Sequence, residues 1–247
     1  PPPGGNYPPP PPGGNYPPPP PGGGYQPGPA GQPRAFSPTD AVVYGWNGFK
    51  NNVGPLVIIG LVLLAASALT NFLSRGFDTL IISATANLLS IFISLVISLG
   101  LIRAALIILD GRKPSVEDLI STDNIGPYII ASIVVTVLTV VGLVLCILPG
   151  LVVAFLAQFY GYAIVDGKAD GGGGAPSSDP IGAIRTSIQV VVANLGQLIL
   201  LLLLSFAINL AGALLCGVGL LVSIPVTAIA LAYAWRSFSA GPIAAQA

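Results

Sequence analysis

The sequence lacks histidine and methionine and has only two cysteines among its 247 residues. Histidine is the commonest metal ligand and general base in proteins. Its absence excludes the Ser-His and Cys-His arrangements that activate a nucleophile. We therefore predict a protein that is not an enzyme and that holds neither a metal nor a cofactor.

Charge is also scarce, since only 7% of the residues are Asp, Glu, Lys or Arg, whereas soluble domains carry about 25%. Nine basic and nine acidic residues leave no net charge. The basic surface that nucleic-acid binding needs is therefore missing, and nucleic acid is excluded as a partner. Hydrophobic residues make up 53% of the chain, so the composition predicts a lipid bilayer around most of it.

Long apolar segments dominate the rest of the chain. About 20 apolar residues in a helix cross the hydrocarbon core. Pro149 and Gly150 divide the longest apolar stretch, because proline lacks an amide hydrogen and glycine permits a tight turn. We predict an all-α fold, a polytopic membrane helix bundle with about six transmembrane helices. The predicted spans are residues 53–73, 80–109, 127–148, 149–166, 190–215 and 218–236.

Basic residues are distributed unevenly over the loops between these spans. If the N-terminus is cytoplasmic, Arg103 lies near the inner end of the second span and only Arg75 lies outside. The remaining basic residues then all lie inside: Arg34, Lys50, Arg112, Lys113, Lys168, Arg185 and Arg236. This asymmetry follows the positive-inside rule and predicts that both termini are cytoplasmic.

Two segments resemble each other at a shift of 142 residues, which predicts an internal repeat. They are "SPTDAVVYGWNGFKNNVGPLVI" and "DPIGAIRTSIQVVVANLGQLIL". Ser37 and Asp179 suit a helix N-cap, and Pro38 and Pro180 suit the first helical position. We predict that each copy is an amphipathic helix at the inner membrane surface that leads into a span.

A second, shorter sequence similarity relates "ILDGRK" at 108–113 to "IVDGKA" at 164–169, and each segment lies at the end of a predicted span. A glycine just past a helix end suits a left-handed cap, and a basic residue there suits the helix dipole. Two interpretations stay open. The repeated motif is either a signal for ending a helix or a paired functional site.

Five motifs, in order, resemble a group of bacterial six-span integral membrane proteins. They are "DAVVYGWNGFKNNVGPL", "RAALIILDGRKPSVEDL", "LPGLVVAFLAQFYGYAIVDG", "PIGAIRTSIQVVVANLGQL" and "IPVTAIALAYAWRSF". They look like the membrane domain found with glycerophosphodiester phosphodiesterases and its stand-alone relatives. A Pro/Gly/Tyr-rich tail on such a body resembles actinobacterial membrane proteins. The resemblance implies a bacterial plasma-membrane location, and the phosphodiesterase domain itself is absent, so no catalytic residue carries over.

Few polar side chains fall within the predicted spans. Arg103 lies in the second span, about two turns before Asp110, and either snorkels to the inner headgroups or has a buried polar role. Asn87, Ser94 and Ser98 share one face of the same span, and Asn209 lies in the fifth. Such polar positions either let helices approach closely or line a cavity. Outside the spans, Ser115 and Asp118 fit a capping box better than an acid/base pair.

The two cysteines lie near the outer ends of two predicted hairpins. Cys146 and Cys216 could meet there as a disulfide or remain small buried side chains.

The first 36 residues form a Pro/Gly/Tyr-rich segment in which "GGNYPPPPP" occurs at 4–12 and again at 13–21. Five consecutive prolines favour polyproline II, and the composition predicts a disordered cytoplasmic tail. Tyr7, Tyr16 and Tyr25 are candidate docking residues, for an aromatic-lined groove or for weak multivalent binding. An inert spacer is the other interpretation.

The predicted domain order is this tail, the six-span domain at 37–240 and a short C-terminal tail at 241–247. We predict a scaffold or recruiting protein at the cytoplasmic face. The alternative is a transporter for small molecules or lipids, built on the duplicated unit.

Overall fold

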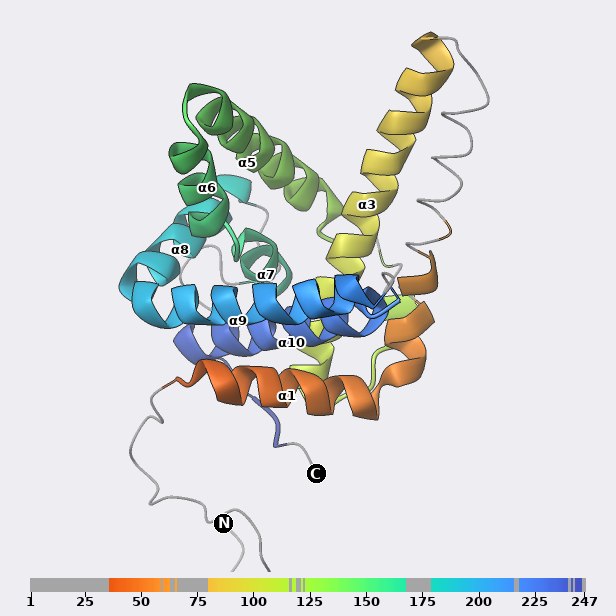
Figure 1. The fold of residues 1–247 in the computed structure, drawn as a ribbon, viewed down its shortest axis with the longest axis vertical. Coiled ribbons are helices and arrows are strands. Elements are labelled where there is room, and N and C mark those ends of the chain that lie inside the picture. The colour runs from red at the N-terminus through yellow and green to blue at the C-terminus, as the bar shows by residue number, and fades with distance from the viewer. Residues whose placement is uncertain are drawn as a thin grey trace, which may run out of the picture. The chain divides into compact units, whose positions relative to one another are not determined.

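A computed structural model describes residues 36–58, 60–62, 65, 80–115, 117–118, 121, 123–167, 179–215, 218–239, 241 and 243–245. The all-α prediction is confirmed over these residues (Figure 1). The helices are α1 (Pro38–Asn51), α3 (Leu80–Leu109), α5 (Ile125–Leu145), α6 (Ile147–Leu156), α7 (Tyr160–Val165), α8 (Pro180–Ala193), α9 (Leu195–Leu214) and α10 (Leu220–Phe238).

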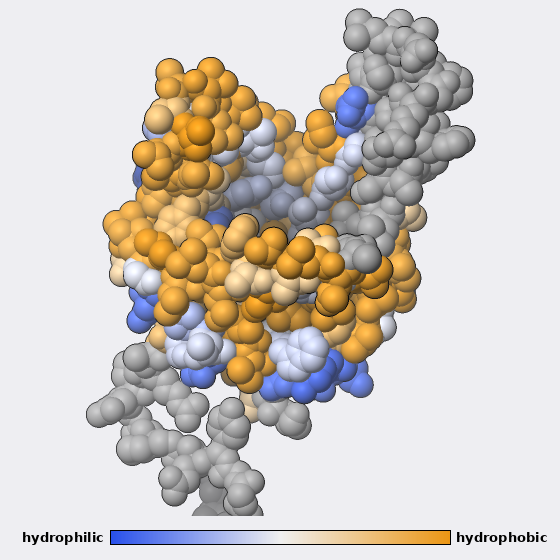
Figure 2. Space-filling model, viewed as in Figure 1, coloured by the Kyte–Doolittle hydropathy of each residue, from blue (hydrophilic) through white to orange (hydrophobic). Residues whose placement is uncertain are grey.

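Five helical segments of the described chain are long and apolar enough to cross a membrane. They are Asn87–Leu109, Ile125–Leu145, Ile147–Val165, Leu195–Leu214 and Leu220–Phe238. Five of the six predicted spans are thus present by length and composition. The predicted span 53–73 lies largely outside the described residues, although residues 53–58 are helical. Apolar side chains cover the outer faces of α5, α6 and α9 in Figure 2, as expected of surface in contact with lipid.

Helix α10 forms the centre of the core. It packs against α1, α3 and α9, and Figure 1 shows α1 and α9 running beside it. Trp235 of α10 and Phe159, in the turn before α7, are fully buried and their ring centroids lie 5.9 Å apart. Most of α10 from Pro225 to Arg236 is therefore buried.

The break between the third and fourth spans differs from the prediction. It falls at Cys146, whose backbone is extended, and not at Pro149 and Gly150. Proline is tolerated in the first turn of a helix, where its missing N–H would have no partner, so Pro149 lies inside α6. Gly150 is also needed inside this turn, because a Cβ there would lie 2.6 Å from the backbone nitrogen of Leu143.

The fourth span is interrupted at residues 157–159, which the sequence analysis did not predict. The interruption frees backbone groups that the hydroxyl of Ser187 satisfies. This hydroxyl accepts a hydrogen bond from the N–H of Phe159 at 3.0 Å and donates one to the carbonyl oxygen of Leu156 at 2.8 Å. Helix α8, which carries Ser187, thus stabilises the break between α6 and α7.

Helices α1 and α8 have the same local structure. Each has 14 residues with proline at its start, and Ser37 and Asp179 cap them through their side chains, as predicted. Each ends at an asparagine, Asn52 or Asn194, whose side chain donates to the carbonyl oxygen four residues earlier. The predicted span 190–215 is therefore wrong at its start, because residues 190–193 belong to α8 and the next helix begins at Leu195.

The same positions are buried in both helices. Ala41, Gly45 and Phe49 of α1 correspond to Ala183, Ser187 and Val191 of α8, each 142 residues apart (183 − 41 = 142). The partners differ, because α1 packs on α10 whereas α8 packs on α5, α6 and α7. Gly45 is required for its contact, since a Cβ there would lie 2.4 Å from the carbonyl oxygen of Val226.

Candidate functional site

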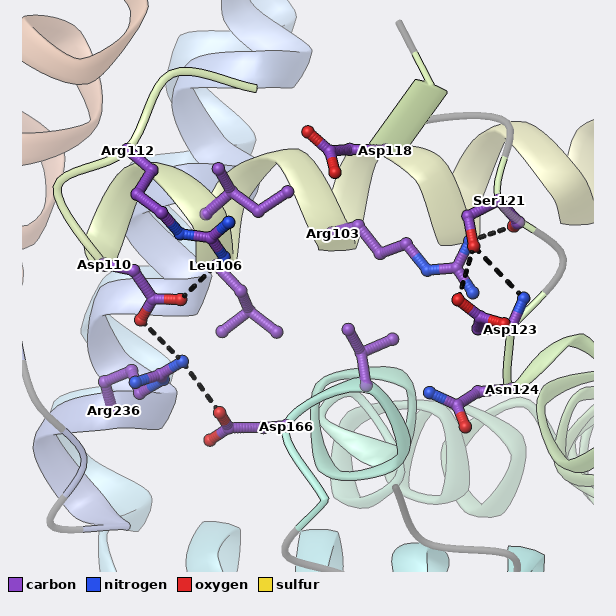
Figure 3. Close-up of a pocket in the computed structure, with 12 residues that line it drawn as sticks. Arg103, Leu106, Asp110, Arg112, Asp118, Ser121, Asp123, Asn124, Asp166 and Arg236 are labelled. Carbon is purple, nitrogen blue, oxygen red and sulfur yellow. Dashed lines mark hydrogen bonds and ion pairs between the residues drawn. The ribbon is translucent and has the colours of Figure 1, made fainter. Parts of the chain in front are cut away.

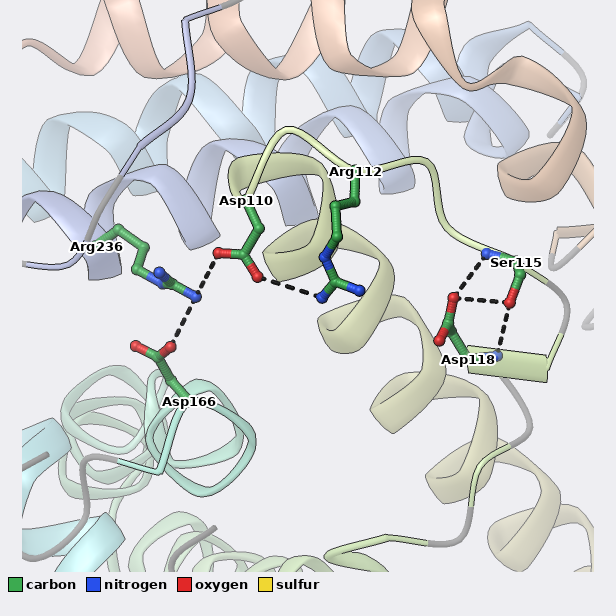
Figure 4. Close-up of polar contacts among 6 residues, drawn as sticks. All are labelled: Asp110, Arg112, Ser115, Asp118, Asp166 and Arg236. Carbon is green, nitrogen blue, oxygen red and sulfur yellow. Dashed lines mark hydrogen bonds and ion pairs between the residues drawn. The ribbon is translucent and has the colours of Figure 1, made fainter. Parts of the chain in front are cut away.

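Three helix ends meet at a buried ion cluster. Asp110 follows α3, Asp166 follows α7 and Arg236 lies in the last turn of α10. The Nη2 atom of Arg236 lies 2.8 Å from Oδ1 of Asp166 and 3.1 Å from Oδ1 of Asp110. Figure 4 shows the guanidinium between the two carboxylates. The side chains of Arg236 and Asp166 are each only 7% exposed, so this is a largely buried pair and not a surface salt bridge.

The two "DG" motifs position these carboxylates. Gly111 and Gly167 have φ of 75° and 70°, the left-handed conformation that glycine adopts at little cost. The N–H of Gly111 donates to Ile108 and that of Arg112 to Ile107, which closes the end of α3. The predicted left-handed caps are confirmed. The structure also brings the aspartates of both motifs to the same arginine, Arg236, so the repeated motif does more than end a helix.

Neighbouring residues fix the cluster. Nε1 of the fully buried Trp235 donates to Oδ2 of Asp166 at 2.9 Å. The C-terminal segment folds back over the end of α3, where the N–H of Ala244 donates to the carbonyl oxygen of Leu109 at 2.7 Å. The hydroxyl of Tyr44 on α1 donates to the carbonyl oxygen of Ala244 at 3.1 Å. Helices α1, α3, α7 and α10 are thus tied together at one end.

A polar pocket of about 330 Å³ extends from this cluster along α3 (Figure 3). Its lining residues come from α3, the connection to α5, the end of α7 and the end of α10. They are Arg103, Leu106, Ile107, Asp110, Arg112, Asp118, Ser121, Asp123, Asn124, Val165, Asp166 and Arg236. Among the described residues, no group of three or more His, Cys, Asp or Glu could hold a metal ion.

Arg103 enters the pocket from α3. It is 7% exposed, and its Nη1 donates to the carbonyl oxygen of Ser121. Its Nη2 is buried and has no hydrogen-bond partner among the residues that the structure describes. Arg103 is thus buried among protein atoms and held by the connection between α3 and α5.

Two further carboxylates of the pocket, Asp118 and Asp123, are held by short loops. The N–H and the hydroxyl of Ser115 donate to Oδ2 of Asp118 at 2.9 and 2.7 Å, and the N–H of Asp118 donates back to the Ser115 hydroxyl at 3.2 Å. This is the predicted capping box. Hydrogen bonds from the side chain and backbone of Ser115 lower the pKa of Asp118 below its ordinary value. The hydroxyl of Ser121 donates to Asp123 in the same way at 2.8 Å.

The other candidate residues do not line this pocket. Asn87, Ser94 and Ser98 are exposed on α3. Asn209 of α9 donates to Oγ1 of Thr227 on α10 at 3.3 Å, so it contributes to helix packing. Cys146 is exposed at the break between α5 and α6. Cys216 and the three tail tyrosines, Tyr7, Tyr16 and Tyr25, lie outside the described residues.

The sequence analysis did not single out the residues of the ion cluster. Asp110 and Asp166 were noted only as parts of the repeated helix-end motif, and Arg236 only as one of the inner basic residues. A signal was present, because a basic residue closes the last span and an Asp-Gly pair closes two earlier ones. Opposite charges at helix ends that lie on the same predicted side of the membrane are candidates for an ion pair.

Five helices suited to crossing a membrane define a polytopic membrane protein, and relatives with comparable sequences occur in mycobacteria. The uncharacterized protein Mb2590 of Mycobacterium bovis is 32% identical over 241 residues, covering 86% of this chain and 71% of the relative. The uncharacterized protein Rv2560 of Mycobacterium tuberculosis is 31% identical with the same coverage. The chain belongs to the family of these mycobacterial proteins. No family model and no solved structure match it.

Proposed function

We propose that this chain is a non-enzymatic protein of the bacterial plasma membrane that recruits other proteins at the cytoplasmic face. In this proposal six spans hold both termini inside, and the recruiting element is the N-terminal arm, residues 1–35. The resemblance to the membrane domain of glycerophosphodiester phosphodiesterases agrees with such an anchor. It supplies no hydrolytic residue.

One observation carries the proposal: Phe36, the first described residue of the body, lies beside its charged end. The ring of Phe36 lies 4.6 Å from that of Phe238 and 6.3 Å from that of Tyr233, centroid to centroid. Arg236, with its two carboxylate partners, lies in the same turn of α10. Since Lys and Arg collect on the cytoplasmic side of membrane proteins, the end of the body that carries Arg112 and Arg236 would face the cytoplasm.

The test is removal of the arm. Deleting residues 1–32 should leave the unfolding temperature in detergent and the yield in membranes unchanged, because the deletion ends before Phe36 and its aromatic contacts. The proteins that co-purify with the full chain should be lost. The full and the shortened chain are each isolated through a C-terminal tag, and mass spectrometry identifies the proteins that co-purify with each.

A second variant separates two ways of binding. Replacing Tyr7, Tyr16 and Tyr25 by serine keeps every proline, so a partner that reads polyproline should be retained, whereas association through repeated tyrosines should be lost. If the shortened chain keeps the same partners, the arm is a spacer and the recruiting proposal is wrong.

Transport is the second candidate, favoured by the pocket beside Arg103. A buried arginine next to a polar cavity within a candidate span is typical of a substrate route. The shared structure of α1 and α8 agrees with a body built by duplication, a common plan of transporters. Uptake into proteoliposomes that is lost in Arg103→Leu would place transport ahead of recruitment.

A further inference from the structure

Among the described residues, Arg103 brings to the pocket a buried donor that the protein leaves unsatisfied. Nη2 of Arg103 has no acceptor among the described residues, although Nη1 is bound to the carbonyl oxygen of Ser121. Figure 3 shows this guanidinium at the wall of the pocket, beside Ser121 and Asp123. A buried cationic N–H without an acceptor is unfavourable, so the arrangement points to an acceptor supplied by a bound molecule.

The carboxylates of the pocket are, by contrast, already engaged by this chain. Arg236 bridges Asp110 and Asp166, and Ser121 donates to Asp123. Asp118 receives both of its bonds from Ser115 on one oxygen, Oδ2. Among the described residues, the groups of the pocket that a ligand could engage thus include Nη2 of Arg103 and Oδ1 of Asp118, the second oxygen of that carboxylate.

The charge of the lining selects the kind of ligand. Among the described lining residues, three arginines and four aspartates give a net charge of −1 (3 − 4 = −1). A simple anion would meet this excess of negative charge. A molecule that carries both an anionic oxygen and an ammonium group would satisfy Arg103 and offset the excess at the same time.

We propose that the pocket binds a zwitterionic phosphate–amine group of the phosphoethanolamine type. A phosphate oxygen would accept from Nη2 of Arg103, and the ammonium group would lie against Asp118. The volume of about 330 Å³ is within the range of small-molecule sites. The group could belong to a lipid headgroup or to a free phosphoamine, which share this chemistry. The inference goes beyond the recruiting function and does not depend on it, because it is argued only from described residues of the helical body.

Native mass spectrometry of the full chain in mild detergent tests the proposal by titration with five probes. These are free phosphoethanolamine, short-chain phosphatidylethanolamine, short-chain phosphatidylglycerol, inorganic phosphate and ethanolamine. The ethanolamine lipid should bind more tightly than the glycerol lipid, or free phosphoethanolamine more tightly than phosphate and ethanolamine. The first result identifies a lipid source and the second a soluble one. Equal binding with and without the amine, binding of ethanolamine alone, or no binding would each overturn the proposal.

Two variants test whether Arg103 and Asp118 make the proposed contacts with the ligand. Arg103→Lys keeps the positive charge and one donor to Ser121 but removes the second nitrogen of the fork, so it should weaken binding about tenfold or more. Asp118→Asn should weaken the preference for the amine-bearing probe without weakening phosphate binding, because it removes one negative charge from the lining. Arg185→Lys, an exposed position of α8, is the matched control and should bind like the wild type. Unchanged affinity in Arg103→Lys, with the fold intact by circular dichroism, would also overturn the assignment.

Discussion

Arg236→Leu is expected to lower the free energy of unfolding by about 3–5 kcal/mol, because it removes the guanidinium from between two carboxylates. The side chain of Asp166 is only 7% exposed, so water cannot replace the lost ion pair. The side chain of Asp110 is 32% exposed, so it loses less than Asp166 when the guanidinium is removed. Unfolding in mixed micelles, followed by the fluorescence of the adjacent Trp235, measures the loss.

Arg185→Leu is the matched control, since Arg185 is exposed on α8 and its replacement should change stability by less than about 0.5 kcal/mol. The double variant Asp166→Leu with Arg236→Leu should be less destabilised than Arg236→Leu alone, because no buried carboxylate is then left without the guanidinium. A loss below about 1 kcal/mol in Arg236→Leu would be typical of an exposed ion pair and would contradict a buried cluster.

Gly45→Ala is expected to destabilise the protein by about 1–3 kcal/mol, although alanine favours helix by about 1 kcal/mol over glycine. The new Cβ would lie 2.4 Å from the carbonyl oxygen of Val226 and 3.3 Å from the backbone nitrogen of Ala230, so α1 would have to move away from α10. Because these neighbours are backbone atoms of a buried helix, a rotamer change cannot relieve the clash. The same unfolding assay measures the effect.

Gly54→Ala is its control, because a Cβ at Gly54 meets nothing within 4 Å. This change should be neutral or should stabilise the helix after α1 by up to about 1 kcal/mol. We therefore expect Gly45→Ala to lower the free energy of unfolding and Gly54→Ala to leave it unchanged or raise it. Equal effects would mean that α1 does not pack against α10 in the closely fitted way described.

Local structure could be predicted where local chemistry decides it. The bounds of α3, Leu80–Leu109, are those expected from its apolar run. The caps at Ser37 and Asp179 and the capping box of Ser115 with Asp118 follow from short sequence patterns. The hairpin break was misplaced because Pro149 is equally suited to a turn and to the first turn of a helix, and the packing of Gly150 against Leu143 decides between them.

The ion cluster and the pocket could not be derived in the same way. Their residues come from α3, the connection to α5, α7 and α10, so they depend on which helix ends lie together. Sequence spacing identifies residues on one helix face, but it does not say which faces meet. Arg103 illustrates this, because both a snorkelling and a buried arginine are compatible with its place two turns before Asp110. Its contact with the Ser121 carbonyl depends on the fold and cannot be read from this spacing.

The central claim is that the charged end of the bundle, with Asp110, Asp166 and Arg236, faces the cytoplasm together with both termini. Labelling of single cysteines in intact cells by a membrane-impermeant maleimide tests it most directly, in a background of Cys146→Ala and Cys216→Ala. Ser74→Cys should react from outside, and so should the native Cys146 where it is kept as the single cysteine in a Cys216→Ala chain, because it is exposed at the break between α5 and α6. Lys113→Cys, Gly172→Cys and Gln246→Cys should react only after the cells are opened. Reaction of Lys113→Cys or Gly172→Cys in intact cells would place the ion cluster outside and contradict the account.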